Sequence, residues 1–305
     1  MSVPPQVAGV VVTYHPDAGF EARLEAMRAE VTPIVVIDNT ATPAARERLR
    51  RACALPGVEL IESEDNLGLA GALNRAFRHL EARGTEAIVA FDQDSTPEPG
   101  LAAALVALQA GDPACAIVGS NWHDEARPRW RARHLRPHAV VPGLFTREEA
   151  RHDLHDVTCV ITSGSLFRLD VWRELGGFDE ALFVDLVDTE FCLRARAAGH
   201  AVGVAARARL AHRRGAKTPV RRLGRTWWPA FMSPLRLRYL FRNRVLVLGR
   251  VGWRRPHWVA FECVYAVKVV AEILFLEDRK AAKLAACMQG TWEGLMGMEG
   301  RIATS

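Results

Sequence analysis

Two aspartates separated by a single residue, Asp92 and Asp94, follow directly on the apolar run at 87–90. On a continuing strand, residues i and i+2 point to the same side, so both carboxylates would face one point in space. Paired carboxylate oxygens suit Mg²⁺ or Mn²⁺, which usually complete their coordination with water and with phosphate oxygens of a substrate. The pair therefore indicates a metal site for a nucleotide diphosphate. A solvated turn is the alternative, because Asp, Ser and Pro between positions 94 and 97 are common turn formers.

A second acidic cluster contains Asp185, Asp188 and Glu190. Asp185 and Asp188 are three residues apart, so we expect them on one face of a helix that begins here, with Glu190 off that face. Acids at a helix N-terminus also complement the helix dipole, which is the simpler explanation when the cluster is taken alone. Beside a metal site, a carboxylate of this cluster could take a proton from a hydroxyl group.

Apolar, largely β-branched runs predict the strands that must position these acids, at 7–12, 34–37, 58–61 and 87–90. Helical spacing or composition follows each strand, at 18–30, 43–52, 70–82 and 98–110. Four alternations of strand and helix predict an α/β fold with a mostly parallel, Rossmann-like sheet flanked by helices.

Polar side chains follow all four strands, namely Thr13, Asp38, Asn66 and Asp92. Ligands of such sheets bind beyond the carboxyl ends of the strands. Each residue singly could cap a turn or the next helix. Four together favour a nucleotide site along this edge.

The second half of the chain is less regular. We expect a strand at 116–119, a long excursion over the site at 121–156, a strand at 157–162 that runs into the small-residue turn 163–165, and a short helix at 170–175.

Length and composition bound the class of protein. The chain has 305 residues, 49% of them hydrophobic, enough for one large α/β domain or a domain with an appendage. Its six cysteines are isolated, so neither a zinc site nor a disulfide framework is indicated, and a reducing cytoplasm fits best. The first residues lack the pattern of a signal peptide.

Charge is distributed unevenly. The net charge is +5, but the segment from Phe191 to Phe261 has 17 Arg and Lys residues and no Asp or Glu. An anionic membrane surface, an anionic small substrate or a nucleic acid could meet such a positive field. We expect no nucleic acid, because no nucleic-acid fold signature accompanies the charge.

An ordered set of motifs spans residues 7–250. The motifs are Val12-Thr13-Tyr14, Ile37-Asp38-Asn39, Asn66-Leu67-Gly68 with Asn74, Phe91-Asp92-Gln93-Asp94-Ser95, Ser163-Gly164-Ser165, Gly177-Phe178-Asp179-Glu180, Val184-Asp185 with Asp188-Thr189-Glu190, and Arg242-Asn243. In this order they resemble the inverting GT-A glycosyltransferases of family 2, and more closely the bacterial rhamnosyltransferases that use dTDP-L-rhamnose.

The resemblance implies a set of donor and metal ligands. Thr13, Tyr14, Asp38 and Asn39 would hold the pyrimidine and ribose, and Asn66, Gly68 and Asn74 would border the nucleotide. Gln93 completes the Asp-Gln-Asp-Ser form of the rhamnosyltransferase-like members, and Arg242 would reach a donor phosphate unless it is one more arginine on a basic face. Asp92, Asp94 and His212 would hold Mg²⁺ or Mn²⁺; without the family, His212 is more simply a surface histidine.

It also implies the chemistry. Asp188 aligns with the catalytic base, and Asp185 with a neighbouring acid that orients sugar or acceptor. A single displacement on dTDP-β-L-rhamnose would give an α-rhamnoside on a saccharide or lipid-linked glycan acceptor. A donor such as UDP-galactofuranose or a UDP-hexose, or a non-catalytic nucleotide- or glycan-binding protein, are the alternatives.

We expect a GT-A domain at 1–225 and a helical extension at 226–305. The apolar stretch 257–276 carries Glu262, Lys268 and Glu272, and three charges argue against a membrane-spanning helix. The extension would pack on the core, form a homodimer, or lie at a bilayer surface beside Trp227, Trp228 and Trp253. The last alternative places a cytoplasmic protein at the inner face of the plasma membrane.

Overall fold

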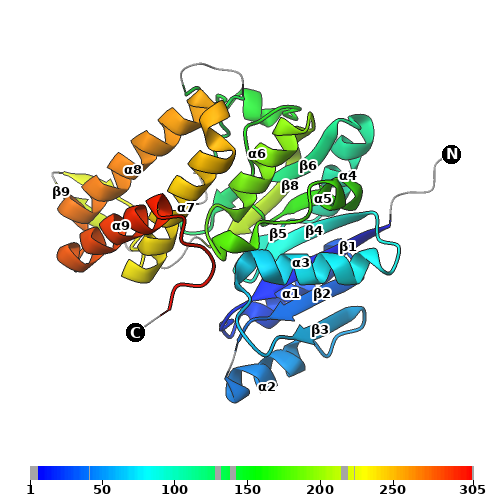
Figure 1. The fold of residues 1–305 in the computed structure, drawn as a ribbon. Helices are drawn as coiled ribbons and strands as arrows, with labels where there is room; N and C mark the ends of the chain where they lie inside the picture. The colour runs from blue at the N-terminus through cyan, green and yellow to red at the C-terminus, as the bar shows by residue number, and fades with distance from the viewer. Residues whose placement is uncertain are drawn as a thin grey trace.

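The computed structural model describes residues 6–40, 42–127, 132–137, 142–213, 219–222 and 224–303. Its first half is a strand and helix alternation, as predicted (Figure 1). The elements are β1 (Val7–Thr13), α1 (Phe20–Glu30), β2 (Ile34–Asp38), α2 (Pro43–Ala52), β3 (Val58–Glu62), α3 (Gly68–Glu81) and β4 (Ala87–Asp92).

The second half adds mixed strands and then helices. The elements are β5 (Ser95–Pro97), α4 (Leu101–Gly111), β6 (Cys115–Asp124), a 3₁₀ turn (Glu149–Arg151), β7 (Ser165–Arg168), α5 (Leu169–Glu174), a second 3₁₀ turn (Glu180–Leu182), α6 (Val187–Ala197), β8 (Ala201–His212), β9 (Val220–Arg222), β10 (Arg225–Trp227), α7 (Pro234–Arg250), a third 3₁₀ turn (Gly252–Arg254), α8 (Pro256–Leu276) and α9 (Lys280–Leu295).

The main sheet has the strand order β3-β2-β1-β4-β7-β6-β8-β5. β1 to β4 are parallel, β7 is antiparallel to both of its neighbours, and β6 pairs with β8 in parallel. The mostly parallel α/β sheet flanked by helices is confirmed. Register places Thr13 beside Asp38 and Val12 beside Asp92, so these strand ends share one edge.

Helices cover both faces of this sheet (Figure 1). Val10, Val35 and Ile88 pack on one face with α3 and α6. Their neighbours along the strands, Val11 and Val36, pack on the other face with α1 and α4. Burial on both faces explains why the strands read as continuous apolar runs in the sequence.

The predicted strand at 157–162 is wrong, since the strand here is β7, which begins only at Ser165, the last residue of the 163–165 turn. Val157 and Val160 are buried, but the segment lacks the regular backbone hydrogen bonds of a β-strand. The amide of Val157 donates to the carbonyl of Val202 and that of Thr158 to the carbonyl of Leu135, so the segment is an irregular buried connection. Of the predicted excursion at 121–156, residues 128–131 and 138–141 lie outside the described residues.

Helices α7, α8 and α9 form the C-terminal region, as expected, and share a small core that contains Leu237, Val269, Ile273, Ala286 and Cys287. The boundary between residues 225 and 226 stays a prediction. Among the helices of the described residues, none is both long and apolar enough to cross a bilayer.

Candidate active site

The end of β4 and the end of β8 bring three candidate metal ligands together. Asp92, Asp94 and His212 offer ligand atoms that all lie within 4.8 Å of one another. His212 Nδ1 is 3.5 Å from Asp94 Oδ1, and its Nε2 is 3.9 Å from Asp92 Oδ2. The antiparallel pairing of β5 with β8 sets Ser95 opposite His212, which carries the histidine to the acidic pair. The structure therefore groups the three residues that the sequence singled out.

The electrostatics of this cluster favour a bound cation. Burial, followed by the charges of Asp94 and Asp188, raises the pKa of Asp92 to about 7, against the opposing charge of Arg236. Burial also raises the pKa of Asp94. Two carboxylates so close together cannot both ionise without a compensating positive charge. Two carboxylate oxygens and one imidazole nitrogen fit a divalent cation.

Two serines orient the histidine. Ser95 Oγ lies 2.7 Å from both Ser163 Oγ and His212 Nδ1, and the amide of Asp92 donates to Ser163 Oγ at 2.9 Å. With Nδ1 committed to Ser95, the Nε2 side of the ring faces Asp92. A hydrogen bond on the second ring nitrogen is how proteins commonly orient a metal-binding histidine. The 163–165 turn thus supports the candidate metal ligands through Ser163.

Asp188 lies in the first turn of α6, and its charge acts on Asp92 of this cluster. Its carboxylate accepts from the amides of Thr162 at 3.2 Å and Thr189 at 2.7 Å. Burial raises its pKa against these hydrogen bonds. Because its charge in turn raises the pKa of Asp92, the proposed base and metal ligands belong to one electrostatic unit.

Asp185 does not share a helical face with Asp188, so that prediction is wrong. α6 begins only at Val187, and Asp185 precedes it with φ of 59°. Phe183 and Leu186 also have positive φ, 62° and 63°. The reason for the error is that helical spacing was extended into a loop.

The carboxylate of Asp185 is held by Arg236, from the first turn of α7, in an ion pair of 3.0 Å. Arg236 also acts electrostatically on Asp92 and Asp94. Sequence reasoning missed this residue, because nothing distinguishes it from the other arginines of the acid-free segment.

Asn243 on α7 holds the loop that carries Asp185. Its Nδ2 lies within 2.9 Å of the carbonyl oxygens of Leu182, Val184 and Asp185. The side chain is fully buried. Asn243 thereby supports a segment in which Phe183, Asp185 and Leu186 have positive φ, which residues with a side chain normally disfavour.

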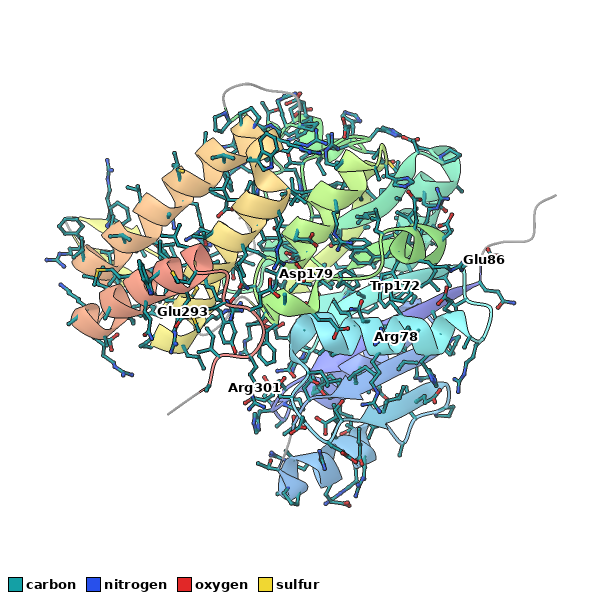
Figure 2. All side chains as sticks on the ribbon, in the orientation of Figure 1. Arg78, Glu86, Trp172, Asp179, Glu293 and Arg301 are labelled. Atoms are coloured by element: carbon teal, nitrogen blue, oxygen red, sulfur yellow. The ribbon has the colours of Figure 1, made fainter. Side chains whose placement is uncertain are left out.

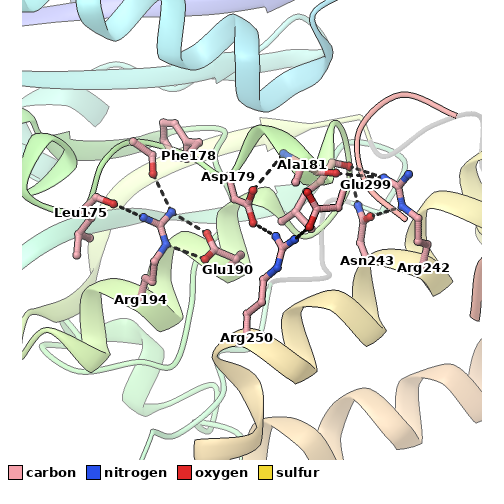
Figure 3. A network of polar contacts seen from close by, with 12 residues as sticks. Leu175, Phe178, Asp179, Ala181, Glu190, Arg194, Arg242, Asn243, Arg250 and Glu299 are labelled. Atoms are coloured by element: carbon pink, nitrogen blue, oxygen red, sulfur yellow. Dashed lines mark hydrogen bonds and ion pairs between the residues drawn. The ribbon is translucent and has the colours of Figure 1, made fainter. Parts of the chain in front are cut away.

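Arg242 is not placed toward the metal cluster. The residue is 1% exposed, and its guanidinium donates to the carbonyl of Gly300 at 2.8 Å and that of Leu182 at 3.3 Å (Figure 3). Its pKa is lowered by burial. The structure therefore gives Arg242 carbonyl partners in place of the predicted donor phosphate, and it is equally not part of an exposed basic face.

Three of the predicted donor-binding residues, Asn39, Asn66 and Gly68, build a turn. Gly68 has φ of 70°, and a Cβ there would lie 2.4 Å from the carbonyl oxygen of Phe183. Asn39 Nδ2 donates to the carbonyl of Gly68 at 2.9 Å, and Asn66 Oδ1 accepts from the amide of Gly68 at 2.9 Å. The glycine thus lets the start of α3 contact the loop at 183–186, which we call the acidic loop because it carries Asp185.

Asn74 is directed away from the strand ends. Its amide bonds the main chain of Phe178 in both directions, at 2.8 and 2.9 Å, and also Glu180. It is 3% exposed. Asn74 therefore anchors the 177–180 loop.

The remaining predicted donor ligands do meet at the strand ends. Thr13 is buried with its hydroxyl on the carbonyl of Ile37, and Tyr14 is exposed. Asp38 Oδ1 accepts from the amide of Thr40, whereas Asp38 Oδ2 is buried without a hydrogen-bond partner. The Gln93 amide bonds both the amide and the carbonyl of Tyr14, at 2.7 and 3.0 Å, so it joins the ends of β1 and β4.

Comparisons with known proteins agree with this geometry. The chain is 26% identical over 300 residues to the "dTDP-rhamnosyl transferase RfbF" of Shigella flexneri, which covers 96% of this chain and 97% of that protein. Among solved structures, a mannosyltransferase of Pyrobaculum calidifontis in complex with GDP-Man and Mn²⁺ matches with a TM-score of 0.60 and 16% identity, over 97% of this chain and 88% of the other. The TarS protein of S. aureus matches with a TM-score of 0.60 and 11% identity, over 95% and 80%.

GalNAc-T7 with UDP, GalNAc and Mn²⁺ matches with a TM-score of 0.61 and 14% identity, over 96% of this chain and 56% of the other. At these identities the solved structures support the fold. The model of the glycosyl transferase family 2 matches residues 10–176, which is more than half of the chain. The chain therefore belongs to glycosyl transferase family 2, with a GT-A fold.

Proposed function

We propose that this glycosyltransferase is metal-dependent and inverting, and that it transfers L-rhamnose from dTDP-β-L-rhamnose to a hydroxyl of a saccharide or lipid-linked glycan in cell-surface polysaccharide synthesis. The observation that carries the proposal is the Asp92, Asp94 and His212 cluster with Asp188 in electrostatic contact. The full-length similarity to a protein named as a dTDP-rhamnosyl transferase supports the donor.

The nucleotide would lie along the edge formed by β1, β2 and β4. Thr13 and Asp38 are adjacent across the β1 and β2 pairing, and Tyr14 follows at the rim. Asp38 Oδ2 accepts no hydrogen bond within the protein, although Arg46 Nε lies 3.8 Å from it. It is the kind of acceptor that the N–H of a pyrimidine base satisfies. Asn39, Asn66, Gly68 and Gln93 would act by shaping this edge, since their polar atoms bond neighbouring main chain.

Asp92, Asp94 and His212 would hold Mg²⁺ or Mn²⁺. A bound ion would balance the negative charge that develops on the departing diphosphate. Arg236 adds a fixed positive charge at the same place, because it interacts with both Asp92 and Asp94. Its guanidinium suits phosphate oxygens.

Asp188 would accept the proton of the acceptor hydroxyl. The hydroxyl oxygen then forms the bond to the anomeric carbon from the side opposite the nucleotide, and the bond between that carbon and the phosphate oxygen breaks with its electrons on dTDP. The proton ends on Asp188, whose raised pKa makes it a better acceptor than an ordinary aspartate. One displacement inverts the anomeric centre, so the product would be an α-rhamnoside.

A donor screen tests the proposal directly. Hydrolysis or transfer would be followed with dTDP-L-rhamnose, UDP-galactose and UDP-galactofuranose, with Mn²⁺, with Mg²⁺ and with a chelator. We expect turnover of dTDP-L-rhamnose and of neither UDP sugar, and we expect the chelator to abolish it. Preference for a UDP sugar would replace the donor assignment and keep the chemistry. Binding without turnover of any donor would favour the alternative of a non-catalytic protein, against which the presence of both acidic clusters argues.

A further inference from the structure

Helix α8 exposes an apolar stripe along its length. Val264, Val267, Leu274 and Phe275 are between 42% and 70% exposed. Their spacing of three, seven and one puts them on one face of a helix. The opposite face of α8 is buried, with Val269 and Ile273 in the core that it shares with α7 and α9.

Helix α9 repeats this arrangement. Met288, Trp292 and Leu295 are between 62% and 70% exposed and follow one another at intervals of four and three. Ala286 and Cys287 point into the shared core. α8 and α9 lie together on one side of the molecule, and side chains stand out from their ribbons there (Figures 1 and 2). Large apolar side chains that recur along two neighbouring helices mark an interaction surface.

The acids of these helices would not repel an anionic partner strongly, because a basic side chain balances the charge of each. Each acid between residues 256 and 295 is in an ion pair. The pairs are Glu262 with Arg244, Glu272 with Lys268, Glu277 and Asp278 with Lys283, and Glu293 with Arg238.

Exposed cations and a tryptophan border the apolar stripes. The β9 and β10 hairpin touches the end of α8, where the Arg222 guanidinium donates to the carbonyl of Phe275. Arg221 and Arg225 of the hairpin are exposed, as are Arg279, just before α9, and Lys280, the first residue of α9. Trp227, the last residue of the hairpin, is 41% exposed.

This combination fits an anionic bilayer better than a second copy of the chain. In a two-fold interface the same patch faces itself, so like-charged arginines would be brought together. An anionic lipid surface neutralises them instead, and the apolar residues enter the boundary between headgroups and acyl chains. Tryptophan side chains are enriched at this boundary.

We propose that the outer faces of α8 and α9, bordered by the β9 and β10 hairpin, form a lipid-binding surface that holds the enzyme on an anionic bilayer without crossing it. Such a surface would bring the enzyme close to a lipid-linked acceptor. Only this link to the acceptor rests on the proposed function. The hairpin lies in the chain between two site residues, His212 and Arg236, so lipid contact and the active site share one segment.

The test is cosedimentation of the full chain with phosphatidylcholine vesicles, with and without phosphatidylglycerol, at low and high salt. We expect binding to the mixed vesicles at low salt and little binding to phosphatidylcholine alone. The double variant Arg221→Glu and Arg225→Glu should bind about tenfold more weakly or worse. The matched control is Arg48→Glu with Arg51→Glu on α2, which lies apart from α8 and α9 and should bind like the unaltered chain (Figure 1).

A second readout uses Trp292, whose fluorescence should be quenched by lipids with brominated acyl chains. The quenching should fall in Trp292→Phe, and Leu274→Ser with Phe275→Ser should weaken vesicle binding while unfolding cooperatively like the unaltered chain. The same measurements on Asp188→Asn separate lipid binding from transfer, since loss of turnover should leave binding unchanged. Failure to bind mixed vesicles at low salt overturns the proposal. So does a dimer in solution that the Leu274 and Phe275 changes convert to a monomer in the absence of lipid binding, because a second copy would then occupy the surface.

Discussion

The guanidinium of Arg236 clasps the carboxylate of Asp185, with Nη2 3.0 Å and Nε 3.2 Å from the same oxygen, Oδ1. This contact ties the first turn of α7 to the loop that precedes the proposed base. The same positive charge lowers the pKa of Asp92 and so opposes the effect of burial, which raises it. Arg236 therefore stands between two acidic groups and partly neutralises both.

Replacement of Arg236 by Met should change metal and donor binding in opposite directions. Loss of the cation leaves the Asp92 and Asp94 pair more negative, so Mn²⁺ alone should bind about tenfold more tightly at pH 8, where proton competition is small. The Michaelis constant for the nucleotide sugar should rise, because a phosphate partner is lost. Titration calorimetry with Mn²⁺ and initial rates measure the two effects. Weaker Mn²⁺ binding in the variant would show that Arg236 acts only through the shape of the loop.

Asp188→Asn should remove transfer and keep the donor. The amide has the size of the carboxylate and cannot take up the hydroxyl proton, so turnover should fall by a factor of about 10² to 10⁴. The affinity for dTDP should stay within about twofold, since no predicted nucleotide ligand is altered. Thr162→Val is a matched control, because Asp188 accepts from the amide of that residue and not from its side chain. Unchanged turnover in Asp188→Asn would contradict the assignment of the base.

Metal affinity should depend on pH around neutrality. The pKa of Asp92 is raised to about 7, so below that pH a proton occupies the carboxylate and must leave when the cation binds. Affinity for Mn²⁺ should therefore fall as pH drops from about 8 to 6, with release of about one proton. Calorimetry in buffers of different ionisation enthalpy counts the protons. Asp92→Asn should bind weakly and release fewer protons; equal release in the variant would assign the titration to another group.

Asn243→Ala should lower both stability and turnover. The change leaves buried carbonyls of the loop without their donor, which costs about 1 to 3 kcal/mol of unfolding free energy. Turnover should fall further than the folded fraction does, because the loop carries Asp185 and leads into Asp188. Asn74→Ala is the matched control, since it also removes a buried amide but one that holds the loop at Phe178. Equal ratios of turnover to folded fraction in both variants would mean that Asn243 has no positioning role.

His134 should weaken the fold at acidic pH. The side chain is buried with Nε2 unpartnered, and burial lowers its pKa from 6.5 to about 4. The unfolded chain therefore takes up a proton before the folded one, and the contribution present above pH 6.5 is lost as pH falls toward 4, by about 3 kcal/mol in all. Urea unfolding at pH 7 and pH 5 should show a smaller loss of stability in His134→Leu than in the unaltered chain. A larger loss in the variant would reverse the sign of the effect.

The strands of the first half were predictable because burial on both faces leaves an uninterrupted apolar run, as in Val35 and Val36. The metal cluster followed from the rule on strand ends and from the family pattern. Arg242 and Arg236 show where this reasoning fails. They are six residues apart on one helix, about 240° around its axis, and only the packing of α7 decides which of them faces the acids. Asp185 was assigned to a helix because spacing alone cannot locate the helix start, which a left-handed residue at Leu186 sets.

The loop at 183–186 joins the family 2 domain to the C-terminal helices of this chain. Phe183, Asp185 and Leu186 have positive φ without being glycines. Side chains of α7 hold this segment together with the amide of Leu69 in α3, which donates to the carbonyl of Phe183, and Arg242 extends the attachment to Gly300. The residues matched by the family model end at 176, before all of these contacts. The contacts of this loop thus cross the boundary expected between residues 225 and 226. The proposed nucleotide edge belongs to the N-terminal half, whereas the loop that leads into the proposed base is held in large part by α7, in the C-terminal region.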